Sequence, residues 1–487
     1  MLMRSVDKRL LEFRQAYADS GKPIRISFRE LCKPWEWARR SDVYTHFLHK
    51  YPAKILPYIP IYFLSSEEYA SKNEAVLDPF CGTGTVLLES IVHPYFARKA
   101  IGVEINPLAR LIAKVKTTPL NVSELKAASE NLCERIEHFP TDVQLPEFEN
   151  RDLWFSKRVQ KRLGTIRSCI EDVDNSDHKD FFLASFSSII RDVSFADPKI
   201  APPVILRSRN FIKNPKLMLK VEKVIQKKKR ANPLQYFKQA VAKNLDRIET
   251  LNSALSLSGK RTKSEIVWDD ARNIRRAKMK CNGELDKTKT KPIRDGSIGL
   301  VITSPPYINA QNYVRTTKFE LFWLGMTGQG ELKHLNERLI GTEAVYHEQY
   351  KDLRLIGVAS ADKVIKKIFK LDPRRAFIVS KYFSDMQRTI EEIYRVLKRN
   401  GRFILVVGNN LVKGIKVKNH EILSDIATRK GLFKREMVLV DQIKSRGMIT
   451  KRHETGGLVL DEWIIVLKKE GRYAFRSSSL RKNSAFI

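Results

Sequence analysis

The sequence predicts an α/β fold with a parallel central sheet that is interrupted by a mainly helical insert. From residue 75 an apolar strand pattern, a glycine turn, an apolar helix pattern and a second strand pattern follow one another, which is how a parallel α/β sheet opens. Between about 121 and 261 this alternation stops, and apolar residues recur at three- and four-residue spacing, as in helices. After residue 262 strand and helix patterns alternate again. One sheet divided by a helical insert accounts for all three observations.

The expected elements follow in chain order. The first residues have the pattern of an amphipathic helix, and a later helix is expected to begin near Asn106-Pro107, because proline suits the first turn of a helix. Strands are expected at 75–80, 100–105, 265–270, 298–307, 402–409, 436–443 and 460–469, and further helices at 232–255, 385–401 and near 420–431. The stretch 272–291, rich in lysine and arginine, is expected to be a polar loop.

Composition narrows the class of protein. A hydrophobic fraction of 43% in 487 residues predicts a globular chain with a sizeable core. Lysine and arginine total 89 against 55 acidic residues, a net charge of +34, which favours a nucleic-acid partner; a generally basic proteome and a ribosome-associated protein are the alternatives.

The five cysteines are scattered without zinc or disulfide spacing, so no metal site is expected and a reducing cytoplasm fits. No window approaches the roughly 18 apolar residues of a membrane span, so no membrane contact is expected.

A glycine turn, DPFCGTGT (78–85), follows the first expected strand. Its two glycines let the backbone approach a ligand closely, and the N-terminus of the following helix favours a carboxylate or phosphate. Acidic Glu104 ends the next strand, where a carboxylate can accept both hydroxyl groups of a ribose. The alternatives are a plain tight turn and a carboxylate that caps a helix. The two motifs together favour a nucleoside cofactor.

A rigid tetrapeptide, Ser304-Pro305-Pro306-Tyr307, ends the apolar strand IGLVIT. The two prolines lack N–H groups and restrict the backbone. The serine offers a hydroxyl, the first proline a free carbonyl and the tyrosine a flat aromatic face. Such a set can hold an exocyclic amine by its hydrogens and stack the ring that carries it. A proline turn with a packing tyrosine is the alternative, but the strand-end position and the upstream glycine turn favour a catalytic loop.

In this order, DPFCGTGT, IGVEINP and TSPPY resemble the motifs of the amino-group DNA methyltransferases of restriction–modification systems, which methylate cytosine N4 or adenine N6. The upstream segment HFLHKYPAKILPYIPIYFL (46–64) is similar to the one that folds over the methionine end of S-adenosylmethionine in many family members. The resemblance covers about 45–120 and 262–470, and its combined motifs are highly specific. It implies a Rossmann-like S-adenosylmethionine-dependent methyltransferase sheet. The insert matches no unit that we can name.

The resemblance implies roles for single residues. In the cofactor site it implies Tyr51, Pro52 and Lys54 of the upstream segment, Asp78, Phe80, Gly82 and Gly84 of the methionine-binding loop, Glu104 at the ribose and Asp270 at the adenine amino group. Because Asp269 precedes Asp270, the register of this last residue is ambiguous. At the catalytic centre it implies that Ser304, Pro305, Pro306 and Tyr307 hold the target base.

The serine bears on which base is methylated. In this family Asp or Asn before Pro-Pro usually accompanies adenine N6, whereas Ser-Pro-Pro-Tyr is typical of cytosine N4, so the resemblance favours N4-methylcytosine. Methylation at cytosine C5 is disfavoured because it needs a cysteine nucleophile, conventionally after proline, and none of the five cysteines follows one. The deaminase signature is absent too. The expected reaction is direct transfer to a base rotated out of double-stranded DNA, without a metal or a covalent intermediate.

The sequence also leads to expectations about the domain organisation of the chain and about its partners. The chain is divided into a basic N-terminal extension (1–40), the cofactor-binding half of the methyltransferase domain (41–120), a helical insert for DNA target recognition (121–261), the catalytic half (262–470) and a basic tail (471–487). Arg315 and Lys318, just after the catalytic loop, are candidate DNA contacts, although a solvated helix face is the alternative. A prokaryotic cytoplasmic, nucleoid-associated enzyme with a candidate cognate restriction endonuclease is expected. The rivals are an adenine-N6 enzyme, an RNA amino-methyltransferase and a non-enzymatic nucleic-acid-binding protein.

Overall fold

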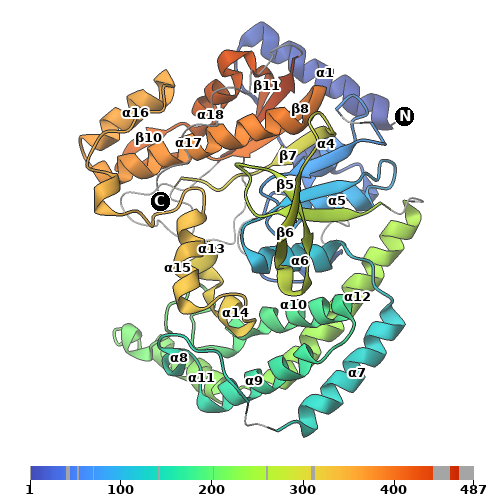
Figure 1. Ribbon diagram of the computed structural model, residues 1–487, viewed down its shortest axis with the longest axis vertical. Helices are drawn as coiled ribbons and strands as arrows, with labels where there is room; N and C mark the ends of the chain where they lie inside the picture. Colours follow the sequence, from blue (N-terminus) through green and yellow to red (C-terminus); the bar gives the residue numbers. More distant parts are fainter. Residues whose placement is uncertain are drawn as a thin grey trace.

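An eight-stranded sheet organises the chain, whose residues 2–39, 44–51, 54–69, 71–140, 143–200, 202–258, 262–308, 313–442 and 461–470 are described by this computed structural model. The strand order is β1-β11-β12-β8-β7-β2-β3-β4 (Figure 1). These strands are β1 (Ile24–Ile26), β2 (Ala75–Asp78), β3 (Ala100–Val103), β4 (Ser264–Trp268), β7 (Ile298–Thr303), β8 (Leu397–Val407), β11 (Phe433–Gln442) and β12 (Asp461–Lys469). Only β12 of this sheet runs antiparallel to its neighbours, so the sheet is mostly parallel.

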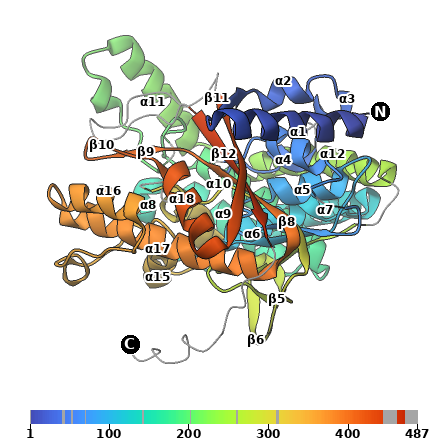
Figure 2. The same cartoon turned by 90° about the horizontal axis from the view of Figure 1, so that it is seen from above.

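Helices cover both faces of the sheet, because successive side chains of a strand point to opposite sides. On β2, Val76 joins a core with helices α1 (Leu2–Ser20), α2 (Phe28–Cys32) and α4 (Tyr58–Leu64). The next residue, Leu77, joins a core with α16 (Ala359–Phe369), α17 (Pro373–Val396) and α18 (Asn419–Thr428). Every residue of β3 and β7 is buried, as a strand inside such a sandwich of helices requires. Figure 2 shows α1, α2 and α4 on the opposite side of the strands from α17.

The N-terminal residues belong to the sheet as well as covering it. β1 pairs in parallel with β11, with Ile24 opposite Leu439, and so forms the edge of the sheet. Helix α1 buries Val6, Leu10 and Phe13 against the same core. The first part of the expected N-terminal extension therefore contributes an edge strand, whereas the expected tail (471–487) lies outside the described residues.

Six helices fill the region between β3 and β4 that follows helix α6 (Pro107–Thr117). They are α7 (Val122–His138), α8 (Arg151–Trp154), α9 (Lys157–Glu171), α10 (Ser176–Val193), α11 (Pro215–Lys229) and α12 (Pro233–Leu257), and we call them the helical segment (Figure 1, lower half). Asparagine side chains accept backbone N–H bonds at the start of α7, α10, α11 and α12, which explains where these helices begin. One apolar core joins the segment to α6 and to α5 (Thr85–Val92).

The basic stretch 272–291 is a β-hairpin and not the expected loop. β5 (Arg275–Met279) and β6 (Leu285–Pro292) pair antiparallel, and the hairpin projects from the body (Figure 2). Ala277, in the middle of β5, and Leu285, beside the turn, are buried, while most of the charged side chains of the hairpin remain exposed. The lysine–threonine alternation of β6 suits an exposed ribbon, because threonine favours strands and the lysines reach water.

Two further boundaries differ from expectation. Helix α17 begins at Pro373, because Asp372 caps its first turn, and not near residue 385. Strand β8 begins at Leu397 and not at residue 402. No helix in the described ranges is both long and apolar enough to cross a membrane.

Candidate active site

Four motifs meet at one edge of the sheet. β7, β2, β3 and β4 are neighbours and run in parallel, so their carboxyl ends lie side by side. At these ends stand, in the same order, the Ser-Pro-Pro-Tyr loop, the glycine turn, Glu104 and the acidic pair. The carboxyl edge of a parallel sheet is where α/β proteins bind ligands.

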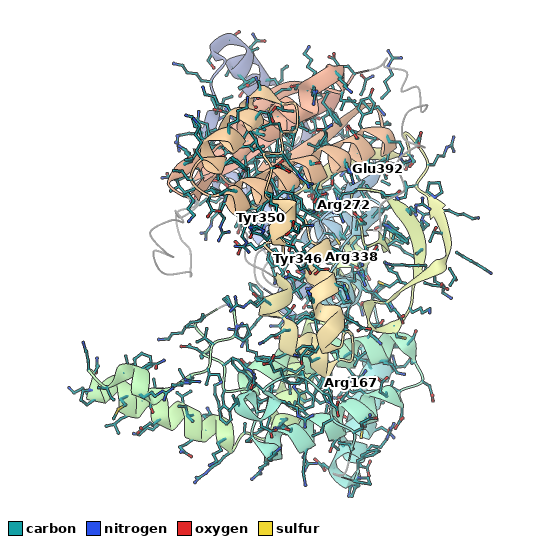
Figure 3. All side chains as sticks on the ribbon, turned by 60° about the vertical axis from the view of Figure 1, so that its left-hand side comes forward. Arg167, Arg272, Arg338, Tyr346, Tyr350 and Glu392 are labelled. Atoms are coloured by element: carbon teal, nitrogen blue, oxygen red, sulfur yellow. The ribbon has the colours of Figure 1, made fainter. Side chains whose placement is uncertain are left out.

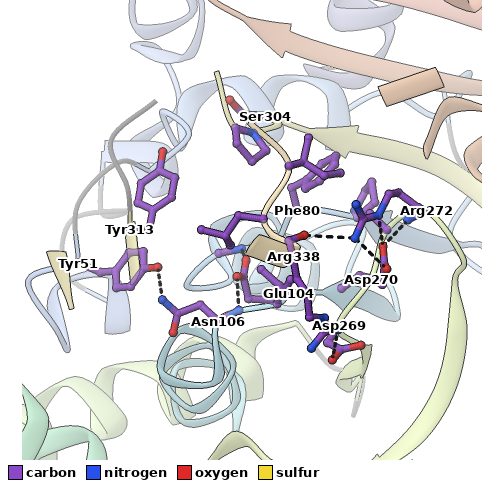
Figure 4. A pocket seen from close by; sticks show the side chains of 18 residues that line it. Tyr51, Phe80, Glu104, Asn106, Asp269, Asp270, Arg272, Ser304, Tyr313 and Arg338 are labelled. Atoms are coloured by element: carbon purple, nitrogen blue, oxygen red, sulfur yellow. Dashed lines mark hydrogen bonds and ion pairs between the residues drawn. The ribbon is translucent and has the colours of Figure 1, made fainter. Parts of the chain in front are cut away.

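A cavity with about 760 Å³ of empty space, including its open mouth, lies against this edge (Figure 4). It is lined by Tyr51, Pro79, Phe80, Gly82, Val103, Glu104, Ile105, Asn106, Asp269, Asp270, Ala271, Arg272, Ser304, Pro306, Tyr313, Arg338, Leu339 and Ile340. Segments more than two hundred residues apart in sequence therefore share one site.

The glycine turn is held open by its backbone conformation. Gly82 and Gly84 have φ angles of 51° and 77°, which other residues rarely adopt. The Gly82 N–H donates to Glu104 Oε2 at 2.9 Å, which fixes the turn to the next strand. Gly84 stands at the start of α5 and does not line the cavity. Gly82 therefore faces the ligand space and Gly84 shapes the turn.

Glu104 is half-buried among backbone donors. Its Oε1 accepts the Asn106 N–H at 2.8 Å, while Oε2 accepts the bond from Gly82. Burial raises the pKa of Glu104, and the bonds from Asn106 and Gly82 work in the opposite direction. A carboxylate has about four lone-pair positions, so the backbone bonds do not use all of them. The same residue thus shapes the turn and can accept hydroxyl groups.

Asp78 connects the glycine turn to the catalytic loop. Its Oδ1 accepts the Phe80 N–H at 3.1 Å and the Thr303 hydroxyl at 2.5 Å, and Thr303 directly precedes Ser304. The side chain is buried beneath the turn and does not line the cavity. Burial raises the pKa of Asp78 to about 7, against the effect of these two hydrogen bonds.

The acidic pair after β4 is divided between two arginines. Arg272 binds both oxygens of Asp270, at 2.9 and 3.1 Å (Figure 4). Asp269 accepts bonds from Lys287 and Arg338 at its Oδ2, at 2.6 and 2.8 Å. Burial opposes the ionisation of Asp269, but these cations outweigh it and lower its pKa.

The two carboxylates differ in one respect. The buried Oδ1 of Asp269 has no hydrogen-bond partner among the described residues, whereas both oxygens of Asp270 are bonded. A buried unsatisfied acceptor is costly unless a ligand supplies its donor. The structure thereby distinguishes the members of a pair whose register the sequence leaves ambiguous.

The catalytic loop reaches the cavity in part. Ser304 and Pro306 line it, and Pro305 is buried. Tyr307 is half-buried and packs at the border of the core that contains Tyr382, so it does not line this cavity. The loop therefore presents its serine to the cavity and its tyrosine to another side.

The upstream segment contributes through Tyr51. Its hydroxyl accepts a bond from Asn106 Nδ2 at 3.2 Å, and its ring stacks on Tyr313 with centroids 6.3 Å apart. Lys54 instead donates to the His46 carbonyl at 2.7 Å and does not line the cavity, and burial lowers its pKa to about 8. Pro52 lies outside the described residues.

The two candidate DNA contacts differ in their surroundings. Arg315 is exposed on α13 (Tyr313–Thr316). Lys318 begins α14 (Lys318–Trp323), and its ammonium lies 5.0 Å from the ring centre of Trp154 and 5.1 Å from that of Phe319. Lys318 is thus half-buried in an aromatic contact, whereas Arg315 faces solvent.

Several cavity residues were not predicted from the sequence. Asn106 caps α6 and also binds Tyr51, and its place directly before Pro107 was a recognisable cap signal. Arg338 and Tyr313 come from helices that follow the catalytic loop, and no local pattern identifies them. No group of three or more metal-binding side chains occurs within the described ranges.

Sequence comparison places the chain among known proteins. No protein-family model matches it. It is 26% identical to the type II methyltransferase M.MvaI of Kocuria varians over 403 residues, 78% of this chain and 80% of the relative. It is also 29% identical to M.AvaI of Nostoc sp. over 29% of this chain and 32% of the relative, and 28% identical to M.MjaII of Methanocaldococcus jannaschii over 25% of this chain and 22% of the relative. The chain is thus a homologue of the type II methyltransferases of restriction–modification systems, and its motifs agree with the amino-group family of these enzymes.

Proposed function

We propose that this protein is a DNA methyltransferase of a restriction–modification system that transfers a methyl group from S-adenosylmethionine to the N4 amine of cytosine. One observation carries the proposal: the Ser-Pro-Pro-Tyr loop, the glycine turn, Glu104 and the acidic pair stand at the ends of four neighbouring strands around a single cavity. The similarity to type II methyltransferases supports the reaction class and DNA as the substrate.

The donor groups of the cavity fit S-adenosylmethionine. Glu104 has acceptor positions left for ribose hydroxyls. The unsatisfied Oδ1 of Asp269 fits the adenine amino group, so we assign this role to Asp269 in place of Asp270. Phe80 and Gly82 line the side next to the catalytic loop, where the methionine end belongs. When bound, S-adenosylmethionine supplies an electrophilic methyl group carried by a sulfonium.

The catalytic loop holds the acceptor amine. A target cytosine rotated out of the duplex, at a cost of a few kcal/mol, stacks on Tyr307. The Ser304 hydroxyl and the Pro305 carbonyl accept hydrogen bonds from the two N–H groups of its N4 amine, which turns the nitrogen lone pair away from the ring and toward the cavity. Thr303, bonded to Asp78, keeps the loop in register with the glycine turn. Positioning by these residues accounts for the catalysis.

The choice of cytosine over adenine depends on Ser304. Serine is a neutral acceptor, weaker than the carboxylate of loops in which aspartate precedes Pro-Pro. The family pattern connects the serine form with cytosine N4, and adenine N6 is the alternative product of the same loop.

The deciding experiment identifies the modified nucleoside. Genomic DNA from cells that express the protein, in a host without other methyltransferases, is digested to nucleosides and analysed by mass spectrometry. We expect N4-methylcytosine, and none from cells that express Ser304→Ala. N6-methyladenine would overturn the choice of base and keep the reaction class. Methylation of tRNA or rRNA without any methylated DNA would overturn DNA as the substrate.

A further inference from the structure

Helix α11 carries one continuous basic face. Lys216, Lys220, Lys223, Lys227 and Arg230 follow at spacings of four, three, four and three residues, so they fall on one side of the helix. All five are exposed. The opposite side carries the buried Val221. The chain therefore directs one side of α11 inward and its cationic side to solvent.

The charges of this basic face are not paired within the described part of the chain, and the helix itself carries a single acidic residue, Glu222. None of its five side chains takes part in an ion pair among the described residues. Some lysines of neighbouring helices are paired: Lys114 with Asp180, Lys157 with Asp152 and Lys238 with Glu137. Uncompensated charges at helical spacing create a positive potential that an ordinary solvated helix with mixed charges lacks.

The position of α11 leaves this face accessible. The helix packs mainly on the short turn Ser208–Phe211 and on α10, and it extends from the body as an arm (Figure 3, light green). Exposed lysines also line α16, at Lys363, Lys366, Lys367 and Lys370. Figures 1 and 2 place α11 and α16 on the same side of the molecule, with α15 (Gln329–Arg338), which ends at the cavity, nearer the centre.

We propose that the basic face of α11 binds the phosphate backbone of the duplex and positions it without reading its sequence; this inference rests on the proposed DNA substrate. From Lys216 to Lys227 the face extends about 16 Å, which matches the axial rise of roughly five base pairs. Lysine is suited to this contact because it meets phosphate as a mobile point charge, whereas base reading needs fixed donor geometry. The positive charge of the α11 face is complementary to the negative charge of the DNA phosphates, and this complementarity identifies DNA as the partner.

The test measures duplex binding as a function of salt, without methyl transfer. Lys216, Lys220, Lys223 and Lys227 are changed together to glutamine, and binding to two labelled DNA duplexes of unrelated sequence is followed by fluorescence anisotropy. Each lost phosphate contact lowers the slope of log K against log salt by about 0.9, so we expect a slope smaller by about 3 to 4. We expect affinity at low salt to fall at least about ten-fold, equally on both duplexes.

A charge-matched control separates this face from net charge. Lys8, Lys22, Lys72 and Lys99 are exposed outside the helical segment, and their joint change to glutamine removes the same charge. We expect that variant to keep the wild-type slope, and a quadruple Lys→Arg change in α11 to keep it too. Circular dichroism and calorimetry with S-adenosylmethionine verify that each variant is folded.

The proposal is overturned by an unchanged slope in the α11 variant, by an equal fall in the control variant, or by an effect seen on one duplex only. A loss of binding confined to double-stranded RNA of the same length would overturn DNA as the partner. If the wild-type protein methylates DNA and yet the α11 variant binds normally, this inference fails while the proposed function stands.

Discussion

At the scale of single residues, Asp78 determines how the two halves of the site stay in register. It lies under the glycine turn, and one oxygen accepts hydrogen bonds both from that turn and from Thr303, which directly precedes Ser304. A carboxylate in such a place is destabilised by burial, which is why its pKa reaches about 7. The protonation state of Asp78 and the arrangement of the two loops that it joins are therefore coupled.

The stability of the ligand-free protein should depend on the charge of Asp78. Between its ordinary pKa of 3.8 and the folded value near 7, the folded protein retains a proton that the unfolded chain releases, so stability falls as pH rises through this window. Asp78→Asn keeps an acceptor oxygen and removes the charge. Its advantage over wild type in urea unfolding should grow, by on the order of 1 to 3 kcal/mol, from about pH 5 to about pH 8. A difference that stays constant with pH would contradict the buried charge.

Asp269 and Asp270 should differ in their effect on cofactor affinity. Asp269→Ala removes a buried, unsatisfied acceptor of a residue that lines the cavity, so S-adenosylmethionine should bind about ten-fold more weakly by calorimetry, the worth of one hydrogen bond. Asp270→Ala removes the anchor of Arg272 and should change affinity less than about three-fold. The reverse order would return the adenine contact to Asp270.

Ser304→Ala should separate chemistry from cofactor binding. Because the hydroxyl is assigned to the acceptor amine, methyl transfer to DNA should fall by about a hundred-fold or more, while calorimetric affinity for S-adenosylmethionine stays within about two-fold. Wild-type turnover in this variant would remove Ser304 from the catalytic role. A parallel loss of cofactor affinity would instead indicate that the serine supports the cofactor.

The sequence predicted those site residues that stand near the ends of strands. Gly82, Glu104 and Ser304 stand directly after apolar strands, and neighbouring parallel strands bring such positions together. Arg338 binds Asp269 from 69 residues away in the chain, and that contact depends on how α15 packs. Lys54 belongs to the upstream segment that the resemblance assigned to the cofactor site. Its ammonium instead donates to the backbone carbonyls of His46 and His49 in the same segment.

At the scale of elements, helix α14 connects the catalytic loop to the helical segment. Its Phe319 and Trp323 are buried among Trp154 and Phe155, with Phe319 and Trp154 rings 4.8 Å apart. Arg167 of α9 also donates to the Leu324 carbonyl at 2.9 Å. The residues that follow the catalytic loop are thus held by the helical segment and not by the sheet.

Phe319→Leu should reduce turnover beyond its effect on stability. The smaller side chain loosens the contact with Trp154, with an expected loss of about 1 to 2 kcal/mol in unfolding free energy and a lower kcat for methyl transfer. Phe237→Leu is the matched control, because Phe237 is equally buried but packs on Phe182, away from α14. Equal kcat losses in both variants would show that general destabilisation, not the position of α14, limits turnover.

The sequence did not predict the helices and strands whose formation or boundaries depend on tertiary contacts. The hairpin β5–β6 was expected to be a loop because it is rich in lysine and arginine, yet cross-strand pairing and the buried Ala277 and Leu285 order it. Helix α17 was expected only from residue 385, although Asp372-Pro373 is a start signal that the sequence does contain.

At the scale of the whole molecule, the helical segment and the cofactor half share one core. Leu87 and Leu108 of α5 and α6 belong to the same apolar cluster as Phe182 and Phe237 of α10 and α12. Without α7 to α12 these surfaces would be exposed to water. The change in hydrophobic periodicity along the sequence predicted the helical segment. It did not indicate that this segment shares an apolar core with the cofactor half.

This shared core predicts how a specificity chimera behaves. Replacement of 121–261 alone by the corresponding segment of a relative such as M.MvaI should give poor soluble yield and a lower Tm, because α14 loses its aromatic partners. Exchange of 313–339 as well should restore both, because α14 then moves with its own partners. The measurement is soluble yield and thermal unfolding of the two chimeras. Equal behaviour of the two would show that α14 tolerates foreign packing.

The edge pairing of β1 with β11 has a consequence during protein synthesis. Arg25 of β1 contacts Asp461, 436 residues later in the chain. At a translation speed of about 5 to 20 residues per second, β1 and the apolar face of α1 leave the ribosome roughly 20 to 90 seconds before their partners exist. For that interval the nascent chain presents an unpaired strand edge, and we expect newly made protein to depend on chaperones that bind such edges.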